Sequence, residues 1–367
     1  MRVTRVRWTA YRVPFRREFV SAAERAAARH GLLLRVEADN GLTGLGEVGP
    51  VGAGDESSVW RLADDLSRRA PTLTGATFAD ITSIADIVSR LDKPVPASVR
   101  FGVETALLDL LGKLERKPLA TLLGGAPRRV PVNALISATS PEQAARDARQ
   151  AVADGFHALK VKVGAASVDE DIRILGAVRD AVGPNVALRA DANAAWSGPQ
   201  AIEALRRMER FGLEYVEQPV GDMAAMAAVC RAVAIPIAAD ELLASVHEAR
   251  RLLALSAAGV FIVKAARTGL LGALEIARLA ARNAVPVVVT SSLETGVGIA
   301  ASLHIAAAKW RDGSPACGLA TGALLASDLL VKPLAVRQGS MTCPDAPGLG
   351  VDLDEAAVAR YTSNIIV

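Results

Sequence analysis

Six charged side chains recur along the chain at intervals of about one strand-plus-helix unit, and their types suit metal-assisted removal of a proton. They are Lys160, Lys162, Asp191, Glu217, Asp240 and Lys264. Each lies at the end of an apolar, β-rich run, which places it near the C-terminal end of an expected strand. In a closed parallel barrel those strand ends converge on one face, where active sites are built. Three acids with lysines on either side therefore predict a metal site for proton abstraction.

The acids Asp191, Glu217 and Asp240 come from three consecutive expected strands. A single carboxylate at a strand end could equally well cap the next helix, but three in a row favour a shared ligand set. Oxygen-only ligands suit a hard cation, and a site completed by water and substrate suits Mg²⁺. The expected cofactor is therefore Mg²⁺, with Mn²⁺ as a substitute.

Lys160 and Lys162 share one face of their strand because side chains alternate. A solvated strand edge would explain two such lysines, but a central barrel strand has no such edge. Two ammonium groups held together beside a divalent cation lower each other's pKa, which makes a lysine a base near neutral pH. Lys162 is the expected general base and Lys160 its assistant. Lys264 is expected across the barrel mouth as a third catalytic residue.

Residues 1–125 predict an α+β domain. The alternating run RVRWTAYRV and the runs LLLRVEAD and LTGLGEV predict strands, the last two joined by a hairpin turn at Asn40–Gly41. Amphipathic segments follow at 57–70, 80–91 and 100–114, and these predict helices. Strands followed by helices are typical of an α+β capping domain.

Residues 126–330 predict a TIM-like (β/α)8-type barrel, because apolar strand signals alternate there with helical segments. The candidate strands are 130–137, 158–164, 186–193, 215–220, 235–241, 259–265, 285–292 and 317–322. One helix start is marked by Ser140 before Pro141. Residues 331–367 return to turn-rich sequence and are expected to dock on the capping domain. The fold class is therefore α/β with an α+β cap.

Composition excludes several classes of protein. The composition, with 51% hydrophobic and 22% charged residues, is that of an ordinary folded protein. A net charge of +3 without a Lys/Arg block argues against nucleic acid. No apolar stretch is long enough to span a membrane, and no signal peptide is visible. Cys230, Cys317 and Cys343 lack metal-ligand spacing and predict unpaired thiols in a reducing, cytoplasmic compartment.

The motifs KVK, DAN, EQP, ADE and VKA, in this order, resemble the enolase superfamily, and within it the muconate-lactonizing-enzyme subgroup. That subgroup has Lys-x-Lys on strand two, metal-binding acids on strands three to five and a lysine on strand six. The segments GLTGLGE and FGVETALLDLLGK are similar to the family's capping domain. The mandelate racemase subgroup would instead have a His/Asp pair on strands six and seven, where this chain has Lys264 and no matching histidine.

The resemblance implies removal of a proton α to a carboxylate, with Mg²⁺ holding the enediolate. The segment TSSLETGVGIAASLHIAAA is similar to that of o-succinylbenzoate synthases, which dehydrate 2-succinyl-6-hydroxy-2,4-cyclohexadiene-1-carboxylate in menaquinone biosynthesis. That lyase activity is the expected function. An N-acylamino acid racemase, a dipeptide epimerase and a muconate-type cycloisomerase stay open as alternatives, and a non-catalytic metal-binding scaffold is a remote one.

The expected partner is a small-molecule carboxylate, and a homo-oligomer is compatible with the sequence. Ser291, Ser292 and the start of the helix after them would bind a carboxylate through hydroxyl and backbone N–H groups, unless the serines only cap that helix. Dipeptide epimerases carry an Asp-x-Asp after strand eight, whereas GLATGALL has no acid. Capping loops at 15–31 and 48–57 are expected to determine substrate shape. The full set of expected substrate contacts is Ser291, Ser292, Glu294, Asn193 and Thr321.

Overall fold

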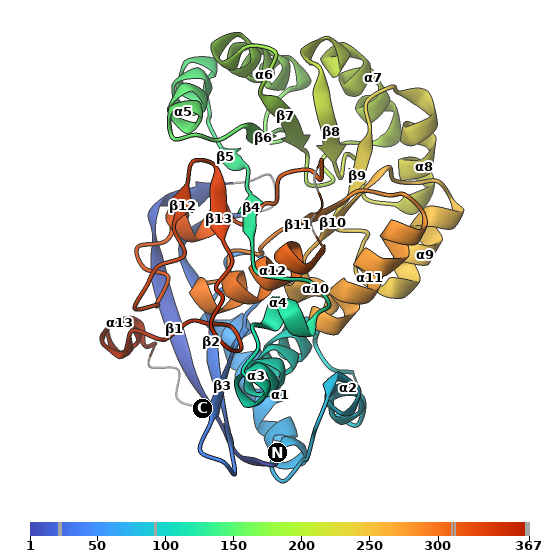
Figure 1. Cartoon of the computed structure of the whole chain (residues 1–367). Helices are drawn as coiled ribbons and strands as arrows, with labels where there is room; N and C mark the ends of the chain where they lie inside the picture. The colour runs from blue at the N-terminus through green and yellow to red at the C-terminus, as the bar shows by residue number, and fades with distance from the viewer. Residues whose placement is uncertain (21–23, 92–93, 310, 312, 364–367) are drawn as a thin grey trace.

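The computed structural model describes residues 1–20, 24–91, 94–309, 311 and 313–363. Figure 1 shows a barrel in the upper part of the view, with an N-terminal sheet and its helices below it. The predicted α/β barrel with an α+β cap is confirmed. No helix in the described part of the chain is long and apolar enough to cross a membrane.

The cap begins with an antiparallel sheet in which β1 (Val3–Val20), β2 (Arg25–Ala38) and β3 (Thr43–Val48) lie in that order. The predicted turn between β2 and β3 is confirmed, because Glu37 pairs with Thr43 across it. The capping loop predicted over 15–31 is instead mostly hairpin, since β1 and β2 extend into it. Its residues 21–23 lie outside the described residues.

The helices that follow this sheet are α1 (Glu56–Leu73), α2 (Ile81–Ser89), α3 (Ala97–Glu115) and α4 (Leu119–Leu122). Helices α1 and α3 pack on the sheet, and α2 and α4 pack on α3. The predicted helices at 57–70, 80–91 and 100–114 are confirmed within a few residues at each end. Helix α3 packs directly on β3, where a Cβ at Gly44 or Gly46 would collide with a backbone carbonyl of α3. Glycine therefore permits the close approach that seals the cap's core.

The barrel strands run parallel and neighbour one another in chain order. They are β5 (Ala134–Ile136), β6 (Ala158–Lys162), β7 (Ala187–Asp191), β8 (Leu213–Glu217), β9 (Ile237–Ala239), β10 (Val260–Val263) and β11 (Val287–Val289). The barrel closes where Val132 pairs with Cys317 and Thr290 pairs with Gly318. The strand predicted over 317–322 is thus reduced to these two residues. After them the backbone turns into a 3₁₀ helix, η2 (Ala320–Leu324), which leaves the sheet.

Helices follow the strands and form the outer layer. They are α5 (Pro141–Ala153), α6 (Val168–Val182), α7 (Gly198–Met208) with η1 (Glu209–Phe211), α8 (Met223–Ala232), α9 (Val246–Ala254), α10 (Ala265–Thr268), α11 (Leu270–Arg282) and α12 (Gly296–Lys309). The start predicted for α5 is confirmed, because the Ser140 hydroxyl accepts from the Gln143 N–H. Helix α12 is buried from Gly296 to Ala308, since it lies between the barrel and the cap.

The C-terminal segment contacts several parts of the molecule. Its strands β12 (Val336–Arg337) and β13 (Ser340–Thr342) form a small sheet with β4 (Arg129–Pro131). Helix α13 (Glu355–Tyr361) lies near β1 (Figure 1). A hydrogen bond of 2.9 Å joins the Ser363 N–H to the Ala10 carbonyl of β1. The predicted unpaired state of the three cysteines is confirmed.

Candidate active site

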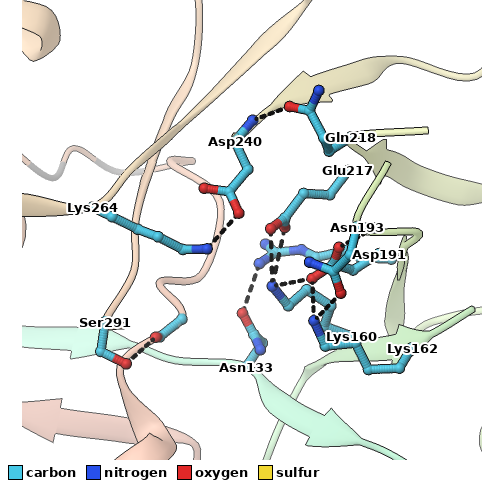
Figure 2. A network of polar contacts seen from close by, with 12 residues as sticks. Asn133, Lys160, Lys162, Asp191, Asn193, Glu217, Gln218, Asp240, Lys264 and Ser291 are labelled. Atoms are coloured by element: carbon cyan, nitrogen blue, oxygen red, sulfur yellow. Dashed lines mark hydrogen bonds and ion pairs between the residues drawn. The ribbon is translucent and has the colours of Figure 1, made fainter. Parts of the chain in front are cut away.

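The structure brings the six predicted charged residues to one end of the barrel. Pairing between β6, β7 and β8 sets Lys162 opposite Asp191 and Asp191 opposite Glu217. Asp240 and Lys264 immediately follow β9 and β10. Figure 2 shows the carboxylates in the centre, with Lys160 and Lys162 on one side and Lys264 on the other. The converging strand ends therefore create the cluster, as the parallel barrel requires.

Lys160 and Lys162 bind the carboxylates from the β6 side. The Lys160 ammonium donates to both oxygens of Glu217, at 3.0 and 3.2 Å, and lies 3.1 Å from an Asp191 oxygen. The Lys162 ammonium is 2.7 Å from that same Asp191 oxygen and 2.7 Å from the side-chain oxygen of Asn193. Two lysines thus share one aspartate oxygen.

A second group of cations binds Asp240. Lys264 pairs with one oxygen of this carboxylate, and Arg267 donates to the other at 2.8 Å. Sequence reasoning missed Arg267, although its position about one helical turn after Lys264 in KAART was a signal. Asp240 therefore has a cation on each oxygen.

Two amide side chains just after the strands hold neighbouring strand ends together. Gln218, also missed by the sequence analysis, accepts from the backbone N–H groups of Asp240 and Leu242. Asn193 accepts from Lys162 and donates to Glu241 at 3.0 Å. Both amides have positive φ, 41° at Gln218 and 44° at Asn193, which is uncommon for residues other than glycine. These left-handed turns direct the amide side chains toward the ends of other barrel strands.

Burial and neighbouring charge oppose each other at the aspartates. Burial raises the pKa of Asp191, but the charges of its three lysine neighbours outweigh burial and hold the pKa well below its usual range. Burial also raises the pKa of Asp240, while Lys264 and Arg267 bring it below the ordinary value. Both aspartates are therefore anions.

Glu217 and Lys160 respond differently. Burial and the negative charges of Asp191 and Asp240 raise the pKa of Glu217 to about 7, against the opposing charge of Lys160. For Lys160 itself, burial lowers the pKa, but the charges of Asp191 and Glu217 raise it well above its usual value. The lowered pKa expected for the lysine pair applies beside a divalent cation and stays a prediction.

The donor set fits a hard divalent cation. Asp191, Glu217 and Asp240 are oxygen donors, each at most 1% exposed, and they lie together at the strand ends. Within the described part of the chain, no three or more His, Cys, Asp or Glu side chains are already grouped for metal binding. Instead, the ammonium groups of Lys160 and Lys264 are bound to these three carboxylates.

A cavity of about 540 Å³ opens over the cluster. Lys160, Lys162, Asp191 and Lys264 line its charged part. A second part is lined by apolar groups, among them Leu135, Phe156, Leu293 and Leu324. The cap contributes Phe19, Glu24, Val51 and Gly52. Both segments predicted as capping loops thus reach the cavity.

Hydroxyl groups line the wall formed by β11 and η2. The Ser291 and Thr321 hydroxyls lie 2.5 Å apart. The buried hydroxyl oxygens of Thr290 and Ser292 have no hydrogen-bond partner among the described residues. All four residues line the cavity, as does Asn193. The Ser291 and Thr321 hydroxyls therefore give this wall hydrogen-bonding groups for a ligand.

Two parts of the expected substrate site lie elsewhere. Glu294 is not among the cavity-lining residues, and its carboxylate accepts from the Ser292 N–H at 2.6 Å. The expectation that the start of α12 binds a substrate carboxylate is wrong. Glu47 of the cap already accepts from the Thr295 and Gly298 N–H groups there. Sequence reasoning missed Glu47, because no local pattern links it to a helix about 250 residues further along the chain.

A barrel of this topology, with three acids between lysines at its mouth and a separate cap, defines an enolase-type enzyme. Two family models match. Residues 2–124 match the "Mandelate racemase / muconate lactonizing enzyme, N-terminal domain" family, and residues 143–357 match the "Enolase C-terminal domain-like" family. The chain therefore belongs to the enolase superfamily, in its muconate-lactonizing-enzyme subgroup, and is an enzyme of that subgroup.

Its relatives catalyse different reactions. Muconate cycloisomerase 1-1 of Acinetobacter lwoffii is 32% identical, over 92% of this chain and 90% of that protein. o-Succinylbenzoate synthase of Thermobifida fusca is 40% identical, over 63% of this chain and 70% of that protein. A dipeptide epimerase of Cytophaga hutchinsonii, solved with Mg and the dipeptide D-Ala-L-Val, superposes with a TM-score of 0.89, at 26% identity, and covers 98% of both chains. The family is thus shown, and the particular reaction differs among the relatives.

Proposed function

We propose that this protein is a Mg²⁺-dependent enzyme that removes the proton α to a carboxylate, and that its reaction is the o-succinylbenzoate synthase dehydration. The carrying observation is the arrangement of Lys162 and Lys264 on opposite sides of the buried carboxylates, inside one cavity. Asp191, Glu217 and Asp240 would hold the metal ion. When bound, Mg²⁺ supplies positive charge that stabilises negative charge developing on the substrate carboxylate.

Lys162 is the proposed general base. As a free amine it accepts the α-proton, and the released electron pair delocalises into the carboxylate as an enediolate. In the dehydration, the bond to the hydroxyl group on the neighbouring carbon then breaks. Lys162 returns its proton to the departing hydroxide, so water is lost and the ring becomes aromatic. Lys160 and Lys264, as cations, would stabilise the enediolate.

The cavity favours a substrate without a free ammonium group. The η2 wall offers Ala320, Thr321, Ala323 and Leu324, none of which carries a negative charge. The acid contributed by the cap, Glu24, accepts from the Ala53 N–H through both oxygens, at 3.0 and 3.1 Å. These features argue against a dipeptide, whose free ammonium group would find no unpaired acid on this wall.

Racemisation of an N-acylamino acid is the second candidate. It is favoured by the presence of a lysine on each side of the carboxylates, because removing a proton from one face and returning one to the other requires two bases. An N-acyl group, like the succinyl group of the cyclohexadiene substrate, has carbonyl oxygens that the hydroxyls of Ser291 and Thr321 would bind.

The test uses the Mg²⁺-loaded enzyme in D₂O with two substrates, the hydroxy-cyclohexadiene carboxylate and a set of N-succinyl amino acids. Dehydration of the first, with a loss of at least ~10²-fold in the Lys162→Ala variant, is the expected result. Rapid α-deuteration and racemisation of the second without any dehydration would replace the primary function by the second candidate. No turnover and no exchange with either would overturn both.

A further inference from the structure

The carboxylate of Glu47 belongs to the cap but lies at the N-terminus of barrel helix α12. It accepts from the Thr295 N–H and hydroxyl, each at 2.8 Å, and from the Gly298 N–H at 2.9 Å. The Tyr11 hydroxyl donates to it at 2.5 Å. Glu47 is 1% exposed. Glu47 thus takes the place that an external anion would occupy at a helix N-terminus.

Glycines make room for this contact. A Cβ at Gly298 would lie 3.1 Å from a Glu47 oxygen and 2.5 Å from the Glu294 Cβ. A Cβ at Gly31 would collide with the Tyr11 hydroxyl that donates to Glu47. The first turn of α12 and the strand beside Tyr11 are therefore shaped around the buried carboxylate.

Two further buried charges extend the contact. Arg29 is fully buried and donates to the carbonyls of Pro50 (2.7 Å) and Gly52. The negative charges of Glu294 and Glu47 act on its guanidinium. The polar cluster therefore links the cap segment around Gly52 to the barrel segment at the start of α12.

Both linked segments form cavity walls. Val51 and Gly52 line the cavity from the cap, and Ser292 and Leu293 line it from the barrel. Leu293 has φ 70°, a left-handed conformation that is costly for a bulky residue and needs support from its surroundings. That support comes from both sides, because Glu294 binds the Ser292 N–H and Glu47 binds the Thr295 N–H.

We propose that Glu47 is a positioning residue that serves as a built-in anion for α12 and thereby fixes the 291–295 wall of the substrate cavity. Because Glu47 occupies the helix N-terminus, the substrate carboxylate next to the departing proton is left to the lysine–carboxylate cluster. The wall then contacts the distal part of the substrate. What the cavity binds rests on the proposed function, whereas the role of Glu47 in holding the wall does not.

Chemical rescue tests this role. Glu47→Ala leaves the Thr295, Gly298 and Tyr11 donors facing an empty space that formate or acetate fits. In the Mg²⁺-loaded variant, we expect faster hydrogen exchange across 291–299 and a KM about tenfold higher, with kcat within about threefold of the wild type. Formate should restore both properties, and chloride at equal ionic strength should not. Unchanged exchange, or no response to formate, would overturn the proposal.

Glu104 provides the matched control. It is a second buried cap glutamate at the N-terminus of a barrel helix, accepting from the Leu271 N–H of α11 at 3.0 Å, but it does not line the cavity. Glu104→Ala should lower the free energy of unfolding while leaving exchange across 291–299 as in the wild type. If it loosens this segment as much as Glu47→Ala does, the effect is general domain docking and the proposal fails.

A second variant covers the case in which Glu47→Ala does not fold. Glu47→Gln keeps the volume but removes the charge and leaves no space for formate. We expect it to raise KM without any formate response; a KM equal to the wild type would contradict the proposal. Exchange and its rescue are measured without substrate. A wild-type enzyme inactive on both substrates would therefore contradict the proposed function alone.

Discussion

Lys162 and Lys264 lie on opposite sides of the carboxylate cluster, and each is bound to a different aspartate. Each aspartate also binds a second cation, Lys160 at Asp191 and Arg267 at Asp240. The two lysines therefore have similar surroundings, although they come from strands far apart in the sequence. In the proposed reaction, the face of the substrate that carries the proton determines which of the two lysines exchanges it.

Replacing Lys264 shows whether its side chain acts as a cation or as a base. If Lys264 acts only as a cation in the dehydration, Lys264→Arg keeps the charge and should retain at least about tenfold more activity than Lys264→Ala. The measurement is turnover of the cyclohexadiene substrate by both variants. Equal loss in the two variants, with α-deuteration kept for one enantiomer of an N-succinyl amino acid, would identify Lys264 as a second base.

Replacing Asp240 should weaken metal binding without unfolding the protein. Asp240→Asn keeps the shape but removes one anionic ligand, and it leaves Lys264 and Arg267 without their shared carboxylate. Calorimetric titration with Mg²⁺ should show an affinity lower by at least about tenfold. The far-ultraviolet circular dichroism should match the wild type. Wild-type Mg²⁺ affinity would rule out Asp240 as a ligand.

The acids and lysines could be placed from the sequence because the parallel barrel topology brings their strand ends together. A residue at the C-terminal end of a parallel barrel strand reaches the mouth whatever its exact rotamer, so Asp191 and Lys264 could be located from strand signals alone. The turn at Gly41 could also be predicted from local sequence, because Gly41 has φ 82° and glycine tolerates that conformation.

The contacts that the sequence did not predict are long-range. Glu47 and Thr295 are 248 residues apart, and no periodicity relates them. The last barrel strand was overestimated, because η2 begins two residues after Gly318.

Glu104 should make stability fall as pH rises. Burial raises its pKa from 4.5 to about 7, against the N–H of Leu271 and the charge of Arg100. Below pH 4.5 both the folded and unfolded states hold the proton. Between pH 4.5 and 7 the unfolded state releases it first, so the free energy of unfolding drops by about 3 kcal/mol, and above pH 7 the loss is complete.

Glu104→Gln removes this titration and keeps an oxygen for the Leu271 N–H. Urea unfolding at several pH values should therefore show the variant gaining stability relative to the wild type as pH rises from 4.5 to 7. A difference between the two proteins that does not change with pH would show that Glu104 does not titrate in this range.

His304 should have the opposite effect and make stability fall as pH drops. Burial lowers its pKa from 6.5 to about 4, partly offset by the hydrogen bond to the Leu349 carbonyl. Above pH 6.5 both states hold a neutral imidazole. As pH falls from 6.5 to 4 the unfolded state takes up a proton first, so about 3 kcal/mol of stability is lost. The folded ring stays neutral because it is buried, with its Nδ1 accepting from the Ala120 N–H at 3.0 Å, between α4 and the C-terminal segment.

The opposite slopes of Glu104 and His304 overlap between pH 4.5 and 6.5, so they offset each other in the wild type. In the Glu104→Gln background Glu217 and Asp171, whose pKa values burial also raises, to about 7 and about 6, still oppose the His304 slope, so the His304 slope is measured as the difference between this variant and the double variant. Adding His304→Asn should remove that slope, at a constant cost of about 1–3 kcal/mol for the Leu349 carbonyl left without its donor. If the double variant keeps the acid-side slope of Glu104→Gln, a group other than His304 is responsible for it.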